Sequence, residues 1–167
     1  AEGDDITFTI SGNELAITSA GVLTFVAAPD YETKSSYDAT VTASDGVNTT
    51  TQDITVNVTD VNEAPVFTSN VTFSADENQT AIDTVTATDA EGDDIVFTVS
   101  GSELAITSAG ILTFVSAPDF ETKSVYIATV TASDGVNETT QDITINVNDV
   151  SMQLFVKTLT VSGSELF

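Results

Sequence analysis

Apolar and polar residues alternate with a period of two along most of this chain. The segment YIATVTAS, residues 126–133, has Tyr, Ala, Val and Ala at every second position. The segment DITINV, residues 142–147, repeats the pattern with Ile, Ile and Val. Such alternation places one apolar row on one face and predicts half-buried β-strands. No stretch has a helical period, so we expect an all-β fold.

The turns between these segments are also marked in the sequence. SDGVN, residues 133–137, separates the two strands just described, and its Asp-Gly pair tolerates the positive φ that tight hairpins need. Thr is common, and this β-branched residue suits the solvent-facing side of a strand. About seven such strands fit into 89 residues, which is typical of a sandwich of two packed sheets.

The chain contains a long internal repeat. A shift of 89 residues superimposes residues 1–61 on residues 90–150, with 50 of 61 positions identical. We therefore expect residues 1–61 to be the C-terminal part of one repeat and residues 62–150 to be a complete repeat. The predicted fold is a tandem array of immunoglobulin-like Greek-key β-sandwiches in which the first repeat is incomplete.

The remaining residues, 151–167, are expected to form the first strand of a following repeat. The match lies between LFVKTLTVSGSE, residues 154–165, and VFTSNVTFSADE, residues 66–77. These residues also have a second resemblance. The segment MQLFVKTLT, residues 152–160, is similar to the opening strand of ubiquitin. The rest of ubiquitin is absent from this sequence.

Composition excludes several function classes. The chain has 26 acidic residues, three lysines and a net charge of −23, whereas a nucleic-acid reader needs a basic surface. An anionic membrane surface would also repel it, and no apolar run is long enough to insert into a bilayer. Without His or Cys there is no Ser-His-Asp triad, Cys nucleophile or ordinary zinc site. Oxygen ligands remain, and hard cations such as calcium prefer them.

The acidic residues recur in clusters at fixed places in the repeat. They lie in DAEGDD (89–94), in PDYE and PDFE (29–32 and 118–121), in ASDG (43–46 and 132–135), in the connector DVNEAP (60–65), and at Glu77. One such cluster alone is normally a solvated loop. Paired carboxylates can also belong to a glycosidase, but that needs a cleft with sugar-stacking aromatic side chains. We expect no enzymatic activity.

In this order, the clusters resemble the motifs of cadherin repeats, specifically the cadherin-like repeats of bacterial surface proteins. The resemblance covers residues 1–150 in two copies. It implies a cadherin-like sandwich, a secreted or cell-surface location, and calcium bound where successive repeats join. Carried over by position, the implied metal ligands are Asp30, Glu32, Asp60, Asn62, Glu63, Asp89, Glu91 and Asp134.

The resemblance also implies a second candidate junction. Its residues are Glu77, Asp119, Glu121 and Asp149. This junction departs from the family pattern, because Ser151 stands where the linker Asn is expected and the following acid and Pro are missing.

Electrostatics favours a cation at the first junction. Two carboxylates about 4 Å apart repel each other by roughly 4 kcal/mol at an effective dielectric constant of 20. Gathering several at one connector is unfavourable unless a cation neutralises them, and calcium accepts six to eight oxygen ligands in irregular geometry. We expect one to three calcium ions there.

Three functions follow as hypotheses. The first is a non-catalytic, calcium-stiffened structural segment of a long extracellular adhesin or surface filament. The second is a subunit of a self-assembling filament in which one chain completes the sandwich of the next by donating a strand. The third is a calcium-dependent module that binds a glycan, another cell-surface ligand or a copy of itself. The expected partners are neighbouring repeats or other copies of the protein.

Overall fold

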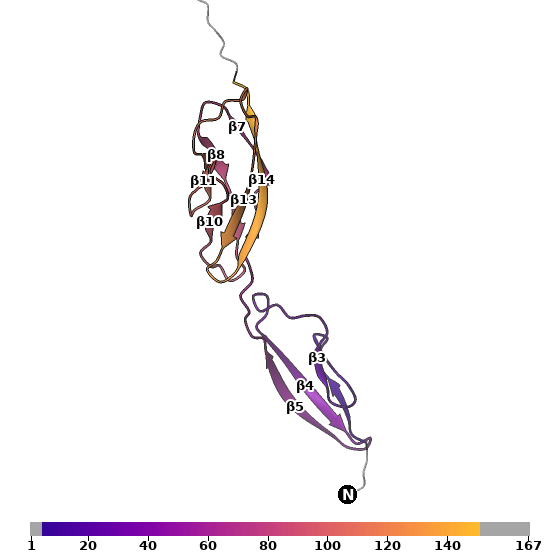
Figure 1. Ribbon diagram of the computed structural model, residues 1–167. Helices are drawn as coiled ribbons and strands as arrows, with labels where there is room; N and C mark the ends of the chain where they lie inside the picture. The colour runs from indigo at the N-terminus through magenta and orange to yellow at the C-terminus, as the bar shows by residue number, and fades with distance from the viewer. Residues whose placement is uncertain (1–4, 151–167) are drawn as a thin grey trace, which may run out of the picture. The chain divides into compact units, whose positions relative to one another are not determined.

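The computed structural model describes residues 5–150, and every regular element in that range is a β-strand. The described residues contain no helix that could cross a membrane. The chain divides into two compact units (Figure 1). Unit 1 comprises residues up to Ala64 together with Asp89–Asp93, and unit 2 comprises Pro65–Thr88 and the residues from Asp94 onward. The expected strand at 151–167, the filament hypothesis that rests on it, and the ubiquitin-like string all lie outside the described residues.

Unit 2 is a sandwich of two main sheets, with a short third pair of strands. The four-stranded sheet has the order β10-β13-β14-β7, from Val96–Val99, Val125–Ser133, Glu138–Asn148 and Thr72–Asp76. The three-stranded sheet has the order β11-β12-β8, from Leu104–Ile106, Ile111–Phe114 and Ala81–Thr84. The pair β6-β9 consists of Val66–Phe67 and Ala87–Thr88. The all-β sandwich predicted from the sequence is confirmed.

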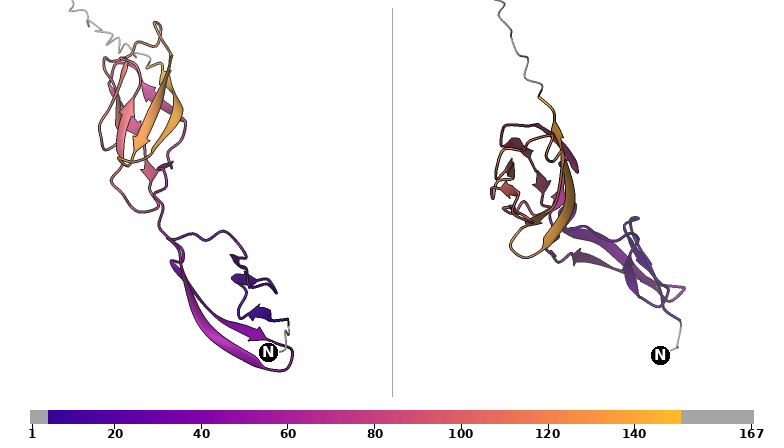
Figure 2. Two further views of the ribbon diagram at one scale, coloured as in Figure 1. Left: turned by 60° about the horizontal axis from the view of Figure 1, so that its bottom comes forward. Right: turned by 45° about the horizontal axis from the view of Figure 1, so that its top comes forward.

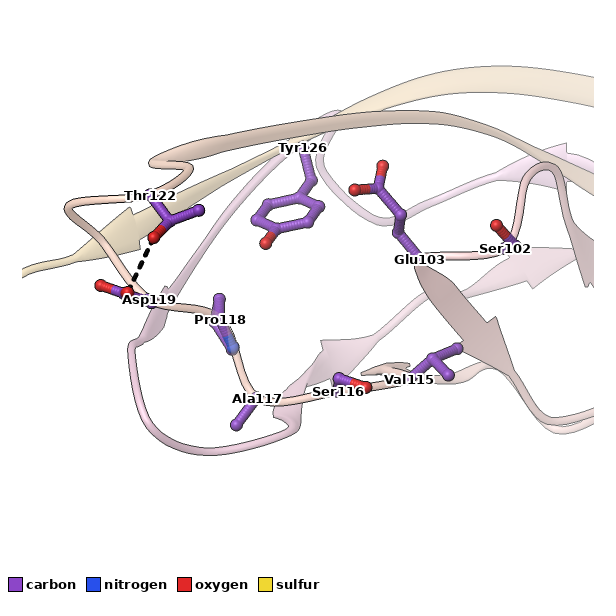
Figure 3. A pocket seen from close by; sticks show the side chains of 9 residues that line it. All are labelled: Ser102, Glu103, Val115, Ser116, Ala117, Pro118, Asp119, Thr122 and Tyr126. Atoms are coloured by element: carbon purple, nitrogen blue, oxygen red, sulfur yellow. Dashed lines mark hydrogen bonds between the residues drawn. The ribbon is translucent and has the colours of Figure 1, made fainter.

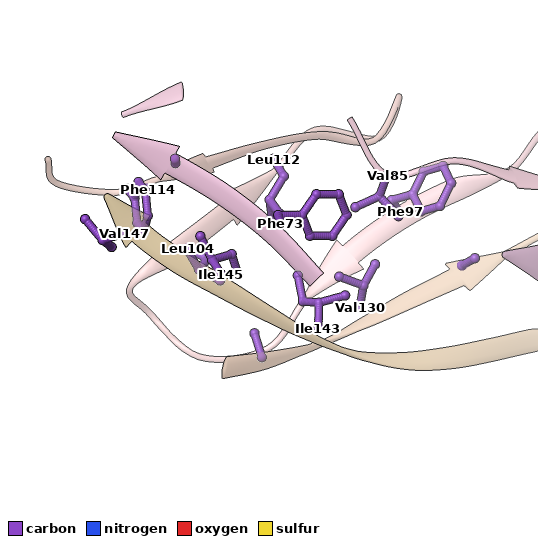
Figure 4. Packing of buried hydrophobic residues seen from close by; sticks show 13 residues of the cluster. Phe73, Val85, Phe97, Leu104, Leu112, Phe114, Val130, Ile143, Ile145 and Val147 are labelled. Carbon is purple, nitrogen blue, oxygen red and sulfur yellow. The ribbon is translucent and has the colours of Figure 1, made fainter. Parts of the chain in front are cut away.

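The core of unit 2 is built from the predicted alternating positions. Val130, Ile143 and Ile145 are completely buried, as are Leu112 of the facing strand β12 and Val85, which follows β8. Figure 4 shows these side chains meeting between the sheets, with Phe73, Phe97 and Phe114 among them. Apolar burial of this kind is the main favourable contribution to folding.

The strands before residue 89 are more broken than the sequence pattern predicts. VFTSNVTFSADE forms two strands, because β6 pairs with β9 whereas β7 runs parallel to β14 in the other sheet. The segment TAIDTVTAT is likewise divided into β8 and β9. Between these two, Val85 is buried and its N–H donates to the carbonyl of Gly110 at 2.9 Å. Each of these two segments therefore forms backbone hydrogen bonds with two different strands along its length. An alternating pattern of apolar residues does not show where a segment changes its pairing partner.

Unit 1 contains only the later strands of the same sandwich (Figure 2). One sheet has the order β1-β4-β5, from Thr7–Ile10, Ser36–Ser44 and Thr49–Asn57. The other is the pair β2-β3, from Leu15–Ile17 and Leu23–Phe25. Their registers repeat those of unit 2: Phe8 pairs with Ala43 as Phe97 pairs with Ala132. The described residues of unit 1 have no counterparts of β6–β9, so the expected incomplete repeat is confirmed.

Candidate functional site

Three glutamates of unit 1 converge at the connector that follows β5. Each of Glu32, Glu63 and Glu91 has a carboxylate oxygen within 4.8 Å of the other two. The loop after β3 supplies Glu32, the connector supplies Glu63, and the loop Asp89–Asp93 supplies Glu91. The N–H of Glu63 also points at Glu91 Oε2, at 3.4 Å. We call these three residues the connector cluster.

The electrostatic state of the connector cluster reflects this crowding. The neighbouring Glu91 carboxylate, with partial desolvation, raises the pKa of Glu63 from 4.5 to about 7. The pKa of Glu91 is lowered, chiefly because the protonated Glu63 carboxyl group donates a hydrogen bond to the Glu91 carboxylate. A hydrogen bond from its own backbone N–H lowers the pKa of Glu32. Desolvation and the neighbouring Asp30, Asp60 and Glu91 raise the pKa by more than this, so the net shift is upward.

No described lysine neutralises these carboxylates. Lys34 binds Glu14 at 2.6 Å and covers the ring of Tyr37, and Lys123 does the same with Glu103 and Tyr126. Two oxygens of the loop 89–93, Asp89 Oδ2 and Glu91 Oε1, are buried and accept no hydrogen bond. Buried acceptors without partners are costly, so these oxygens indicate room for an additional ligand.

A hollow of about 480 Å³ lies against the connector cluster within unit 1. Its lining includes Asp30, Glu32, Glu63 and Ala90, together with apolar side chains of the connector. The carboxylates of Glu32 and Glu63 thus line a space that solvent and a small cation can enter.

The other predicted ligands of this junction have different surroundings. Asp30 Oδ1 accepts the N–H groups of Glu32 and Thr33 and its Oδ2 accepts the Thr33 hydroxyl, and this hydroxyl is the first cause that lowers the pKa of Asp30. Asp89 Oδ1 accepts the N–H of Asp93 at 3.1 Å. The Asn62 side chain donates to the carbonyl of Glu63 at 2.8 Å. Asp60 acts on the cluster through its charge.

Asp134 belongs to unit 2 and is not a member of a three-carboxylate group among residues 5–150. Its Oδ1 accepts the N–H groups of Val136 and Asn137 at 2.6 Å each, which closes the β13–β14 hairpin. The Asp-Gly turn predicted from the sequence is therefore also held by its aspartate side chain.

A second group of carboxylates lies entirely in unit 2. Glu77, Asp119 and Glu121 have carboxylate oxygens within 4.8 Å of one another, and we call them the Glu77 cluster. Glu77 is buried, with its two oxygens accepting the N–H groups of Phe120 and Val150 at 3.0 Å. A hydrogen bond from its own backbone lowers the pKa of Glu121, but Asp119, desolvation, Glu77 and Asp149 give a net upward shift. The Thr122 hydroxyl is the first cause that lowers the pKa of Asp119.

A shallow hollow of about 300 Å³ adjoins the Glu77 cluster (Figure 3). It is lined by Tyr126, Pro118, Asp119 and several hydroxyl groups. A sugar needs an open aromatic face on which to stack. Here Lys123 covers the Tyr126 ring at 4.3 Å and Phe114 contacts it edge-on at 4.9 Å between centroids. The geometry gives no support to the glycan-binding hypothesis at this place.

The lysine that covers this ring should matter little for stability. Replacing Lys123 by Met removes its ion pair with Glu103. The Lys123 side chain is 42% exposed and the Glu103 side chain is 57% exposed. We expect the free energy of unfolding of unit 2 to fall by about 1 kcal/mol or less, because exposed ion pairs and cation–π contacts are weak. Urea unfolding of the Lys123→Met variant measures this loss of stability. The Lys34→Met variant, at the equivalent position of the first repeat, provides the comparison. A loss several times larger in either variant would contradict it.

The shared proton of the connector cluster gives a pH prediction. Because the pKa of Glu63 is raised to about 7, the folded protein without calcium holds a proton that the unfolded chain releases nearer 4.5. This contribution to stability is complete below about pH 4.5 and is lost as the pH rises through about 7. Carboxylate NMR in the presence of a chelator should show Glu63 titrating with a midpoint near 7.

The partner variant provides the check on this assignment. Glu91→Gln removes the neighbouring charge, so the Glu63 midpoint should fall toward 4.5. A Glu63 midpoint near 4.5 in the unsubstituted protein would show that the two carboxyl groups do not share a proton.

Comparison with known proteins shows which proteins this chain resembles. No protein-family model matches the chain. Chitinase A of Pseudoalteromonas piscicida is 36% identical over 124 residues, which cover 72% of this chain and 15% of that protein. Mouse protocadherin Fat 4 is 37% identical over 142 residues, which cover 74% of this chain and 3% of that protein. The chain thus spans only a small part of each of these relatives.

The solved structures agree on the fold. The crystal structure of human protocadherin-24 EC1-2 matches 89% of this chain and 84% of its own, with a TM-score of 0.65 and 22% identity. This chain is cadherin-like. Its sandwich is the cadherin fold in one full repeat and one partial repeat, as the sequence resemblance implied.

Sequence reasoning on the cadherin-like chain named all members of both carboxylate clusters. It did not reveal that Asp30, and Asp119 of the Glu77 cluster, also stabilise their own loops through their side chains. The signal for that second role was present, because each aspartate is followed three residues later by a Thr that can bond back to it.

Proposed function

We propose that this cadherin-like chain is a non-catalytic, calcium-stiffened structural segment of an extracellular adhesin or surface filament. One observation carries the proposal. In the connector cluster, three carboxylates converge without a described lysine beside them, and two neighbouring carboxylate oxygens are buried without a partner. A cation supplies the missing positive charge and the missing partner together.

Calcium fits this set of donors better than the other common metal ions. Every side chain available at the cluster is an oxygen donor, and the donors come from three separate loops with irregular spacing. Calcium accepts such ligands, whereas magnesium demands a regular octahedron and zinc favours nitrogen and sulfur. Glu32, Glu63 and Glu91 would hold the ion, with Asp89 Oδ2 as a further donor. Bound calcium would neutralise the mutual repulsion of these carboxylates.

The connectivity of the ligands supports a mechanical role. Glu91 lies in a loop that is continuous at both ends with unit 2, whereas Glu32 follows β3 and Glu63 lies in the connector. An ion held by all three would restrain the motion of the connector. Extracellular calcium modules commonly have dissociation constants near 10⁻⁴–10⁻³ M, so this restraint would operate at extracellular calcium concentrations. We expect the chain to hold other parts of a longer molecule apart.

The chitinase relative does not change the proposed role. The match covers 15% of that protein and leaves most of it unmatched. We propose that the present segment contributes structure and adhesion and does not hydrolyse glycans itself. Incubation with chitin oligosaccharides should give no cleavage, and hydrolysis that survives repurification would overturn this part of the proposal.

Calcium titration with a structural readout tests the main proposal. Isothermal titration calorimetry should detect one to three ions at the connector cluster, with dissociation constants of about 10⁻⁴–10⁻³ M. Small-angle X-ray scattering should show a narrower distribution of chain dimensions with calcium than with a chelator. Binding without any change in scattering would remove the stiffening role, and no binding would remove the calcium site.

A further inference from the structure

Unit 2 buries a carboxylate that the proposed calcium site does not use. Glu77 follows directly after β7 and is 8% exposed, and it is the only charged residue that is buried between residues 5 and 150. Burying a charged group costs free energy unless hydrogen bonds replace the water that the group loses. The partners of this carboxylate therefore indicate its role.

Both oxygens of Glu77 accept hydrogen bonds from backbone N–H groups of unit 2. Oε2 accepts the N–H of Phe120 at 3.0 Å, and Oε1 accepts the N–H of Val150 at 3.0 Å. Phe120 lies in the loop between β12 and β13, and Val150 lies two residues beyond the end of β14. Hydrogen bonds to an ionised acceptor are stronger than those between neutral groups. One side chain thus joins three segments that are far apart in the sequence.

The backbone beside Glu77 contacts the same two segments. The N–H of Glu77 donates to the carbonyl of Asn148 at 3.1 Å, and the N–H of Asn78 donates to the carbonyl of Pro118 at 2.9 Å. The ladder between β7 and β14 ends at Asn148. The N–H of Val150 lies beyond this ladder, so its partner is the Glu77 side chain.

The neighbouring acid Asp119 also has its partners within the protein. Its carboxylate accepts the N–H of Glu121 and the hydroxyl of Thr122, and Figure 3 shows the second of these bonds. Among the described carboxylates, the buried oxygens without a partner belong to the loop 89–93, and none belongs to the Glu77 cluster. The feature that indicated a cation at the connector is therefore missing here.

The donors of the Glu77 cluster disagree with the calcium site that the family resemblance implies at this junction. Calcium requires six to eight oxygen ligands. Because Glu77 and Asp119 already accept hydrogen bonds with both of their oxygens, the exposed carboxylates of Glu121 and Asp149 are what remain of the implied ligands. Two exposed carboxylates do not fit the ion.

We propose that Glu77 is a calcium-independent clasp, which fastens the backbone beyond β14 to β7 and to the loop after β12. Its two carboxylate hydrogen bonds fix the position of Val150, two residues past the last strand of unit 2. The clasp acts without a metal ion, unlike the connector cluster, for which we propose a role that depends on calcium.

Amide hydrogen exchange of the unsubstituted protein in chelator gives the first test. The N–H of Val150 lies outside every strand, so without the clasp it should exchange as fast as an amide of an unstructured peptide. We expect exchange to be slower by about tenfold or more, because the amide is released only when its bond to a buried acceptor opens. Adding calcium should leave this protection unchanged.

The Glu77→Gln variant gives the second test, also in chelator. Glutamine offers one acceptor oxygen and an NH2 group, so it leaves one of the two N–H groups without a partner. Exchange of the Phe120 or the Val150 amide should become about tenfold faster, by the same factor in chelator and in calcium. Glu121→Gln removes a charge from the same cluster at an exposed side chain, and it should leave both amides unchanged.

Two results would count against the clasp. A Val150 amide that exchanges in chelator like that of an unstructured peptide would overturn the proposal, and this measurement does not require any variant to fold. An effect of Glu77→Gln that appears only in calcium would make Glu77 a metal ligand instead. Neither readout depends on whether the connector cluster binds calcium.

Discussion

Replacing Glu63 and Glu91 together by glutamine should abolish most of the calcium-dependent rise in melting temperature. At a calcium concentration ten times the dissociation constant, one bound ion stabilises the folded state by about 1.4 kcal/mol. For a unit of this size, that free energy corresponds to a rise of roughly 6–11 °C. Glutamine keeps the volume and one oxygen of glutamate but loses the charge, so the variant should hold calcium poorly.

The same variant should behave differently in a chelator. Glu63 and Glu91 crowd each other without a described lysine beside them, so removing both charges relieves repulsion. The melting temperature in chelator should therefore equal or exceed that of the unsubstituted protein at pH 8, and the order should reverse when calcium is added. This crossover separates loss of a metal site from simple destabilisation.

A control variant removes the same number of charges elsewhere. Asp5 and Glu138 are exposed and belong to neither carboxylate cluster, and Glu138 corresponds to Thr49 in the first repeat. Asp5→Asn with Glu138→Gln should keep the full response to calcium. If the unsubstituted protein melts at the same temperature in calcium and in chelator, the proposed calcium site is refuted.

The sequence was informative about which acids meet. The resemblance to cadherin repeats implied eight ligands at one junction, and three of them, Glu32, Glu63 and Glu91, have carboxylate oxygens within 4.8 Å of one another. The chemistry of each oxygen could not be predicted, because it depends on loop conformation. The carboxylate oxygens of Asp30 accept hydrogen bonds from the Thr33 hydroxyl and from two backbone N–H groups, whereas one oxygen of Asp89 is buried without a partner.

The alternating pattern predicted which side of each strand faces the core but not how completely the core is covered. Leu23 and Leu112 have almost the same neighbours in sequence, and both lie in short strands that pair with Leu-Ala-Ile. Their exposures differ because the strands that cover Leu112 come from residues 66–88, far from it in sequence. Burial is a property of the assembled sandwich, so a local pattern predicts it only when every layer is present.

This difference leads to the second large expected effect. Ile143→Ala should lower the free energy of unfolding of unit 2 by about 3–4 kcal/mol. Ile143 is 0% exposed in a packed core, and deleting three methyl or methylene groups there loses burial and leaves a cavity. The same substitution at the equivalent Ile54 should cost unit 1 only about 1 kcal/mol, because that side chain is half-buried and solvent can fill the space it leaves.

The two units must be followed separately, since a chain with two compact units has no single unfolding free energy. Hydrogen exchange of amides in β13 and β14 reports on unit 2, and that of amides in β4 and β5 reports on unit 1. Val136→Ala, at a hairpin position that is 74% exposed, should change either value by less than about 0.5 kcal/mol. Equal losses for Ile143→Ala and Ile54→Ala would mean that Ile54 is packed as tightly in solution as Ile143, which would contradict this prediction.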